Sequence, residues 1–152
     1  MPRCERPTRS ASSGMALRPE TRARARALQL LYAWETEGRP ALDVLLPGVA
    51  RLTRPAPEVL ERAIDLAGAV MARHDELDRL FADAAEHWRV ERLAVIDRNI
   101  LRIGAYELAT ERVPPRVAID EALWLAHRFG GRESPGFING VLDAVARRLG
   151  RL

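Results

Sequence analysis

The sequence contains no lysine, a single cysteine and few aromatic side chains. Without lysine, the chain lacks a residue that P-loop ATPases, pyridoxal enzymes and protein kinases require. The lone Cys4 cannot form a disulfide bond within the chain, and no apolar run reaches the length of about 18 residues that a membrane helix needs. No signal-peptide core precedes the first predicted helix. These absences exclude those enzyme classes and predict a cytoplasmic protein with no membrane partner.

The side chains that most often carry catalysis or bind metal are scattered along the chain. The histidines have no second histidine or cysteine at a zinc-ligand spacing; they are His74, His87 and His127. Ser134 lacks the glycine two residues earlier that a nucleophile elbow requires, and a role as helix cap explains it. The glycines around it follow a predicted helix and lack the spacing and the lysine of a phosphate loop. We therefore predict no catalytic residue, no metal site and no cofactor.

Charge is distributed unevenly between the two parts of the chain. Residues 1–26 hold seven arginines and two acidic residues, a net charge of +5, whereas residues 27–152 hold 17 arginines and 19 acidic residues, a net charge of −2. Such an asymmetry favours a polyanion, RNA or DNA, that is bound by the N-terminal part. The alternative is that the exclusive use of arginine reflects coding bias and that the basic end is only solvated.

The chain divides into a short lead and one helical domain. Residues 1–19 contain prolines, serines and no apolar period, which predicts a flexible basic lead with Met15 as an alternative natural start. Residues 20–152 show the 3.6-residue period of helices in about seven segments and no alternation typical of strands. The fold class is therefore predicted to be all-α. The first predicted helix begins near Thr21. The other six cover about 42–50, 57–71, 77–88, 91–109, 118–129 and 134–149.

Several local features predict how these helices are placed. The segment 91–109 is apolar on two sides and is expected to lie in the middle of the domain. Gly130 and Gly131 are expected to end the sixth helix with a left-handed turn, and Ser134 to cap the seventh. Four carboxylates opposite an apolar stripe are predicted to be a solvated face: Asp75, Glu76, Asp78 and Asp83.

Three arginines at the start of the first helix are the candidate contacts for a polyanion. On a helix Arg22 and Arg26 share a face, and Arg24 lies about 160° away from both. The free amide groups at a helix N-terminus favour anions, and guanidinium groups suit phosphates and base edges. A helix start with this pattern could straddle a strand of phosphates.

Separated sequence blocks indicate a known family. The chain contains LQLLYAW at 28–34, DRNILRI at 97–103, VAIDEA at 117–122 and FINGVLD at 137–143. In this order the blocks resemble the NusB family of bacterial transcription antitermination factors, over about residues 20–149. The resemblance implies a non-enzymatic RNA-binding protein with an all-α fold of two packed helical subdomains.

The partners that the resemblance implies are RNA and other transcription factors. Members of the family bind the boxA element in the leader of ribosomal RNA transcripts together with NusE, a small-subunit ribosomal protein. That complex joins NusA and NusG on RNA polymerase and suppresses premature termination. The family includes monomers and homodimers, and both states remain open for this chain.

The resemblance also assigns residues to the RNA. The arginine-rich motif of the family corresponds to Arg22, Arg24 and Arg26, and its RNA surface extends to Phe137 at the start of the last helix. Phe137 is expected either to stack on an unpaired RNA base or to belong to the core.

Two further residues are assigned to the protein partner. The family uses its first and central helices to bind NusE, which corresponds to Tyr32 and Asp97 here. An intramolecular ion pair of Asp97 with Arg98 or Arg102 is the competing interpretation.

Two alternatives come from other functional classes. NusB-like domains also precede methyltransferase domains in certain ribosomal RNA cytosine methyltransferases, but no glycine-rich cofactor loop follows within these 152 residues, so we expect the antitermination role. The second alternative is a pure protein-interaction module. It predicts binding to protein that salt does not weaken and no binding to RNA, whereas RNA affinity falls steeply with salt.

Overall fold

The computed structural model describes residues 17–85 and 90–152, and these form helices without any strand. The predicted all-α class and the number of helices are confirmed. Most of the predicted lead, with Cys4 and Met15, lies outside the described residues, as do His87 and Trp88. The helices are α1 (Pro19–Thr36), α2 (Leu42–Thr53), α3 (Pro57–Ala72), α4 (His74–Ala84), the short 3-10 helix η2 (Val90–Arg92), α5 (Val95–Thr110), α6 (Pro115–Phe129) and α7 (Ser134–Arg148).

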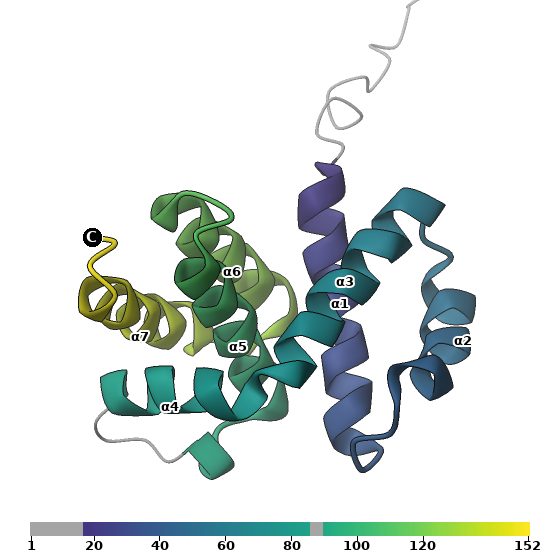
Figure 1. Ribbon diagram of the computed structural model, residues 1–152, viewed down its shortest axis with the longest axis horizontal. Helices are drawn as coiled ribbons and strands as arrows, with labels where there is room; N and C mark the ends of the chain where they lie inside the picture. The colour runs from purple at the N-terminus through teal and green to yellow at the C-terminus, as the bar shows by residue number, and fades with distance from the viewer. Residues whose placement is uncertain (1–16, 86–89) are drawn as a thin grey trace, which may run out of the picture.

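The helices form two packed groups, and α1 makes most of the contacts between them (Figure 1). In the first group α1 packs against α3 and α2, and in the second α5 packs against α4, α6 and α7. The groups meet where α1 contacts α5 and α6 and where α3 contacts α5. Both ends of α1 therefore lie next to the second group, which brings the basic end of this helix close to α6.

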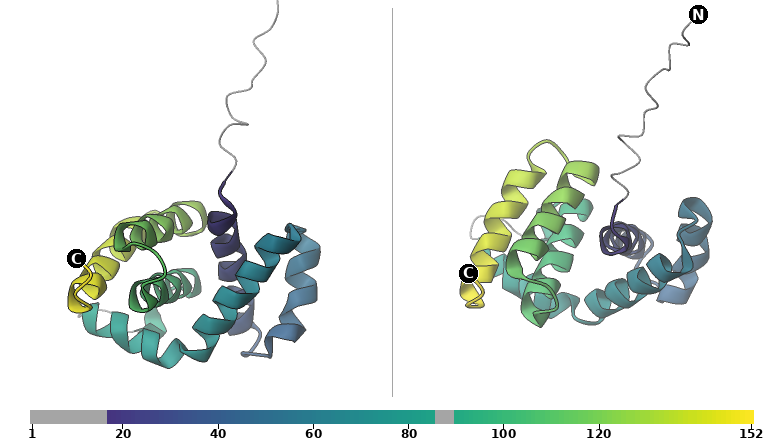
Figure 2. Two further views of the ribbon diagram at one scale, coloured as in Figure 1. Left: turned by 45° about the horizontal axis from the view of Figure 1, so that its top comes forward. Right: turned by 90° about the horizontal axis from the view of Figure 1, so that it is seen from above.

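Helix α5 is the central element, as its two apolar sides predict. Figure 2 shows it enclosed by α4, α6 and α7, and every residue from Asn99 to Leu108 is buried. Gly104 permits the close approach of α7, because a Cβ atom at this position would lie 2.6 Å from Leu142 Cδ1. Because α5 is buried on all sides, it forms the centre of a single core in the second group.

Several predicted boundaries differ from the structure. Helix α1 begins at Pro19, where the fixed φ angle of proline suits the first turn, so Thr21 does not cap it. Helix α2 extends to Thr53, beyond the predicted end near residue 50. The left-handed turn predicted at the end of α6 is wrong: Gly130 has φ −84°. A glycine is required there for space, because a Cβ atom would lie 2.7 Å from Ala126 O and from Ser134 Cβ.

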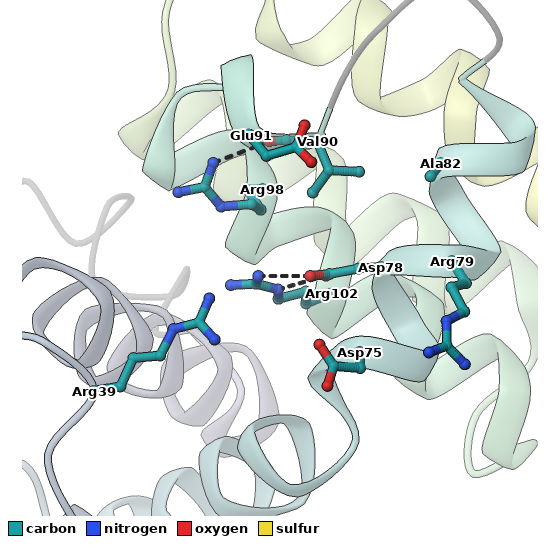
Figure 3. Close-up of a pocket in the computed structure, with 9 residues that line it drawn as sticks. All are labelled: Arg39, Asp75, Asp78, Arg79, Ala82, Val90, Glu91, Arg98 and Arg102. Carbon is teal, nitrogen blue, oxygen red and sulfur yellow. Dashed lines mark hydrogen bonds and ion pairs between the residues drawn. The ribbon is translucent and has the colours of Figure 1, made fainter.

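A buried network of charges joins the two groups of helices. Arg102, only 1% exposed, donates to Asp78 through Nε and Nη2 at 2.7 and 2.8 Å, and its Nη1 also pairs with Glu35 of α1. Arg98 pairs with Glu35 as well and donates 3.0 Å hydrogen bonds to the backbone oxygens of Val90 and Leu93. Figure 3 shows the two arginines side by side in a cavity of about 470 Å³. The network ties α1 to α4 and α5.

The network corrects the prediction for Asp78 and keeps Glu35 ionised. Asp78 is not part of a solvated face, because its carboxylate is held by Arg102. Burial by itself raises the pKa of Glu35, but the hydrogen bonds from Arg98 and the charge of Arg102 outweigh it and hold that pKa below its usual value. Glu35 is therefore ionised at neutral pH and balances the buried arginines.

Within the described residues, no helix combines the length and the apolarity needed to cross a membrane.

Candidate nucleic-acid interface

The first turns of α1 present two arginines without an acidic partner. Arg22 is exposed and Arg26 is half-buried, and no carboxylate of the described residues forms an ion pair with either. The two side chains lie one turn apart on the same face of the helix, as predicted. Unpaired guanidinium groups with this spacing can each take one phosphate oxygen of a polyanion.

Arg24 lies on the other side of α1 and points into the protein. Its Nε and Nη2 donate to the two carboxylate oxygens of Glu107, both at 2.7 Å, and its Nη1 lies 3.6 Å from Glu121 Oε1. Burial by itself lowers the pKa of Arg24, but the hydrogen bonds to Glu107 and the nearby charges raise it above the usual value. Arg24 is 6% exposed, so a direct contact with RNA would require this ion pair to open.

A second anchor holds the same turn of α1. Thr21 donates a 2.8 Å hydrogen bond from its hydroxyl to Glu121 Oε1 of α6. Together with Arg24, it connects the start of α1 to α5 and α6, on the side opposite to Arg22 and Arg26. The orientation of Arg22 and Arg26 is therefore determined by buried polar contacts across the helix.

An apolar groove follows Arg22 and Arg26 along α1. Its volume is about 290 Å³, and its walls come from α1, α2, the start of α5 and the end of α6. Tyr32 is 45% exposed and Leu52 is 85% exposed, which is unusual for large apolar side chains. The lining residues are Leu28, Gln29, Tyr32, Ala33, Val49, Leu52, Thr53, Ile96 and Phe129.

One polar atom in the wall of this groove lacks a partner. Gln29 Oε1 is buried and accepts no hydrogen bond from any described residue. A buried oxygen of this kind is costly unless a donor reaches it. A protein that filled the groove could satisfy it with an N–H or O–H group.

A separate cleft contains both Phe137 and Asp97. It has a volume of about 490 Å³ and lies between the start of α5 and the start of α7. Phe137 is half-buried and packs against the core, as one of its two predicted roles requires, and stacking of its ring on an RNA base stays a prediction. The cleft is lined by Arg92, Leu93, Ala94, Asp97, Gly131, Arg132, Glu133, Ser134 and Phe137.

The predicted ion pair of Asp97 with a neighbouring arginine is wrong. Arg98 and Arg102 are both directed to Glu35, and Arg102 also to Asp78. Asp97 Oδ1 is buried and accepts no hydrogen bond from the described residues. Among the described residues, Asp97 Oδ1 is therefore an unsatisfied buried acceptor.

The groove and the cleft are lined by residues that are adjacent in the sequence. At the start of α5, Ile96 lines the groove and Asp97 lines the cleft. At the end of α6, Phe129 lines the groove and Gly131, which follows the helix, lines the cleft. The sequence assigned Arg22, Arg26, Tyr32, Asp97 and Phe137 to two binding surfaces. In the structure Tyr32 lines the groove, Asp97 and Phe137 line the cleft, and Arg22 and Arg26 precede the groove on α1. Arg24 is the assigned residue that is buried.

Sequence reasoning missed the residues that support these surfaces. Glu107 and Glu121 lie 83 and 97 positions after Arg24, and nothing local indicates that they pair with it. Gln29 had a local signal, since it is a polar residue between Leu28 and Leu30 in an otherwise apolar segment. Ser134 does not cap α7, and its hydroxyl accepts a hydrogen bond from Gly131 N–H instead.

The described residues contain no group of three or more histidine, cysteine or acidic side chains that could hold a metal ion. The side chains at the groove and the cleft are suited to binding, because they offer cations, an aromatic ring, unpaired acceptors and apolar area.

Comparison with known proteins identifies relatives over most of the chain. The NusB family model matches residues 21–147. The transcription antitermination protein NusB of Solibacter usitatus is 43% identical over 129 residues, which cover 84% of this chain and 88% of the relative. NusB of T. maritima has a solved structure with a TM-score of 0.74 and 30% identity, covering 87% of this chain and 93% of that one.

A further solved structure contains NusB together with other molecules. It is a crystal structure of the antitermination factors NusB and NusE in complex with double-stranded RNA, with a TM-score of 0.76 and 24% identity. The match covers 88% of this chain and 99% of that one, and at this identity it shows the fold alone.

Proposed function

The chain belongs to the NusB family, and we propose that it is a transcription antitermination factor that binds boxA RNA in ribosomal RNA leader transcripts together with NusE. The observation that carries the proposal is the pair of arginines without an acidic partner on the same helix as an apolar groove, together with a separate cleft that contains an aromatic ring. Its role requires binding and no catalysis. NusA, NusG and RNA polymerase are the further partners expected once this complex has formed.

The RNA side of the proposal consists of two parts. Arg22 and Arg26 neutralise phosphates, which gives affinity without sequence preference. Phe137 offers its ring to an unpaired base, and the positive end of the α7 dipole lies beside it. The role of Arg24 is to hold α1 in position through Glu107.

The protein side of the proposal is the apolar groove of Tyr32. NusE is expected to cover the exposed ring and Leu52 and to donate a hydrogen bond to Gln29 Oε1. Asp97, whose Oδ1 is also unpaired, would accept a second one at the edge of the groove. The crystal structure of NusB with NusE and RNA supports this partner pair, because the proteins share the fold.

The test is the binding of a fluorescent boxA RNA and of a scrambled RNA of equal length, each with and without purified NusE, at two salt concentrations. The proposal expects a preference for boxA that NusE enhances and salt weakens. A Tyr32→Ala variant should keep the RNA binding and lose the enhancement by NusE. Equal and weak binding of both RNAs, unchanged by NusE, would contradict the proposal.

Replacing Phe137 by alanine is expected to weaken boxA binding by about 1–3 kcal/mol, because base stacking on an aromatic ring is lost. The measurement is a titration of the variant with boxA RNA at constant salt. Trp124→Ala serves as the control, since Trp124 is a partly buried aromatic residue of α6 outside the cleft. An equal loss of boxA affinity in both variants would contradict base stacking and show that Phe137 is only a core residue.

A further inference from the structure

The C-terminal end of α6 lies beside the basic face of α1. Near the start of the helices Glu121 contacts Thr21 and Arg24, and further along both helices Phe129 lines the same groove as Gln29. The two helices therefore run side by side in the same direction. Arg128 follows Glu121 by about two helical turns, which places it on the side of α6 that faces α1.

Three arginines gather at this point without acidic partners. Arg128 is exposed, and none of the described carboxylates pairs with it or with Arg22 and Arg26. Burial and then the charges of Arg22 and Arg128 lower the pKa of Arg26. Arg24 of α1, in contrast, is neutralised by Glu107. A cluster of like charges that repel one another is stabilised when a polyanion binds.

Arg128 also lies between the two sites predicted to contact RNA, which are the arginines of α1 and the Phe137 cleft. The chain passes from Arg128 through Gly130 to Gly131 and Arg132, which line the cleft of Phe137. The guanidinium carbon of Arg128 is 5.3 Å from the centre of the Phe129 ring, which supports its stem at the edge of the apolar groove. A strand bound to α1 and to Phe137 has to cross this region.

We propose that Arg128 is a third phosphate contact, and that the RNA backbone runs from Arg22 and Arg26 of α1 over the end of α6 to the Phe137 cleft. The inference rests on the proposed RNA-binding function and extends it to a helix that the sequence did not assign to RNA. The competing explanation is structural, since a cation at a helix C-terminus is favourable in itself.

The test compares Arg128→Ala with Arg116→Ala in titrations with boxA and scrambled RNA over a series of salt concentrations. Arg116 is an exposed arginine at the opposite end of the same helix, so both variants lose one charge. Arg128→Ala should weaken both RNAs several-fold and reduce the slope of log affinity against log salt by about 0.7, the value for one phosphate on a single strand. Arg116→Ala should leave the slope unchanged.

Four results would separate a failure of the Arg128 inference from a failure of the proposed function. Equal affinities and slopes for the two variants would overturn the inference. A lower melting temperature of Arg128→Ala with an unchanged salt slope would also overturn it and favour the structural explanation. Failure of the wild-type protein to bind RNA would overturn the proposed function itself, whereas binding that is lost only in Arg22→Ala/Arg26→Ala would leave that function intact and reject Arg128.

Discussion

Arg102→Ala is expected to lower the free energy of unfolding by about 3–5 kcal/mol, the cost of removing one partner from a buried ion pair. The side chain of Arg102 is 1% exposed and bridges Glu35 and Asp78, so its loss leaves acidic groups without their cation at the contact of the two helix groups. The change is measured by urea denaturation followed by circular dichroism.

Two variants sharpen this test. Arg102→Lys keeps the charge but cannot form the two parallel hydrogen bonds to Asp78, so its loss should be intermediate. Arg79→Ala removes an exposed arginine of the same cavity and should change the stability by less than about 0.5 kcal/mol. Similar stabilities of Arg102→Ala and Arg79→Ala would show that the network does not hold the two groups together.

Arg24→Ala is expected to cost about 3 kcal/mol of stability, because Glu107 would remain buried without its cation. The side chains of Arg24 and Glu107 are 7% and 8% exposed. Arg62→Ala is the matched control, since Arg62 pairs with Glu20 on the first turn of α1 but both side chains are about half exposed. The control should lose less than about 1 kcal/mol.

The same variant separates a positioning role from a phosphate contact. If Arg24 only orients α1, Arg24→Ala should leave the salt slope of RNA binding unchanged when measured where the variant is folded. A contact with phosphate would reduce that slope by about 0.7. A reduced slope together with wild-type stability would contradict the role assigned to Arg24.

The helical class and the central position of α5 were predictable because both follow from local period. A 3.6-residue repeat of apolar residues identifies a helix, and apolar residues on two sides identify a buried one. Helix ends were less predictable. At Gly130 the residue type was correct for a turn, but the reason for a glycine was the closeness of Ser134, which is a tertiary contact.

The binding face was predictable only in part. The spacing of Arg22, Arg24 and Arg26 gave their relative directions on α1, but it did not tell which side faces the protein. The alternating residues are alanines, and such small side chains on both sides give a weak amphipathic signal. Arg24 faces the protein because it pairs with Glu107, which is on a helix distant in the sequence.

Contacts between distant helices explain the remaining differences. Asp97 and Phe137 meet in one cleft because α5 and α7 pack together, a pairing that no local pattern contains. Asp78 looked like a surface acid because it lies opposite an apolar stripe. Its partner Arg102 comes from another helix and was not visible from the sequence around it.

The most direct test of the central claim is the salt dependence of boxA affinity for the wild type and for Arg22→Ala/Arg26→Ala. Arg22 and Arg26 are predicted to neutralise two phosphates, so the slope of log affinity against log salt should be shallower by about 1.4 in the double variant. Melting temperature should stay near that of the wild type, because neither side chain has an ion-pair partner among the described residues. Identical slopes and affinities for the two proteins would contradict the assignment of this face of α1 to RNA.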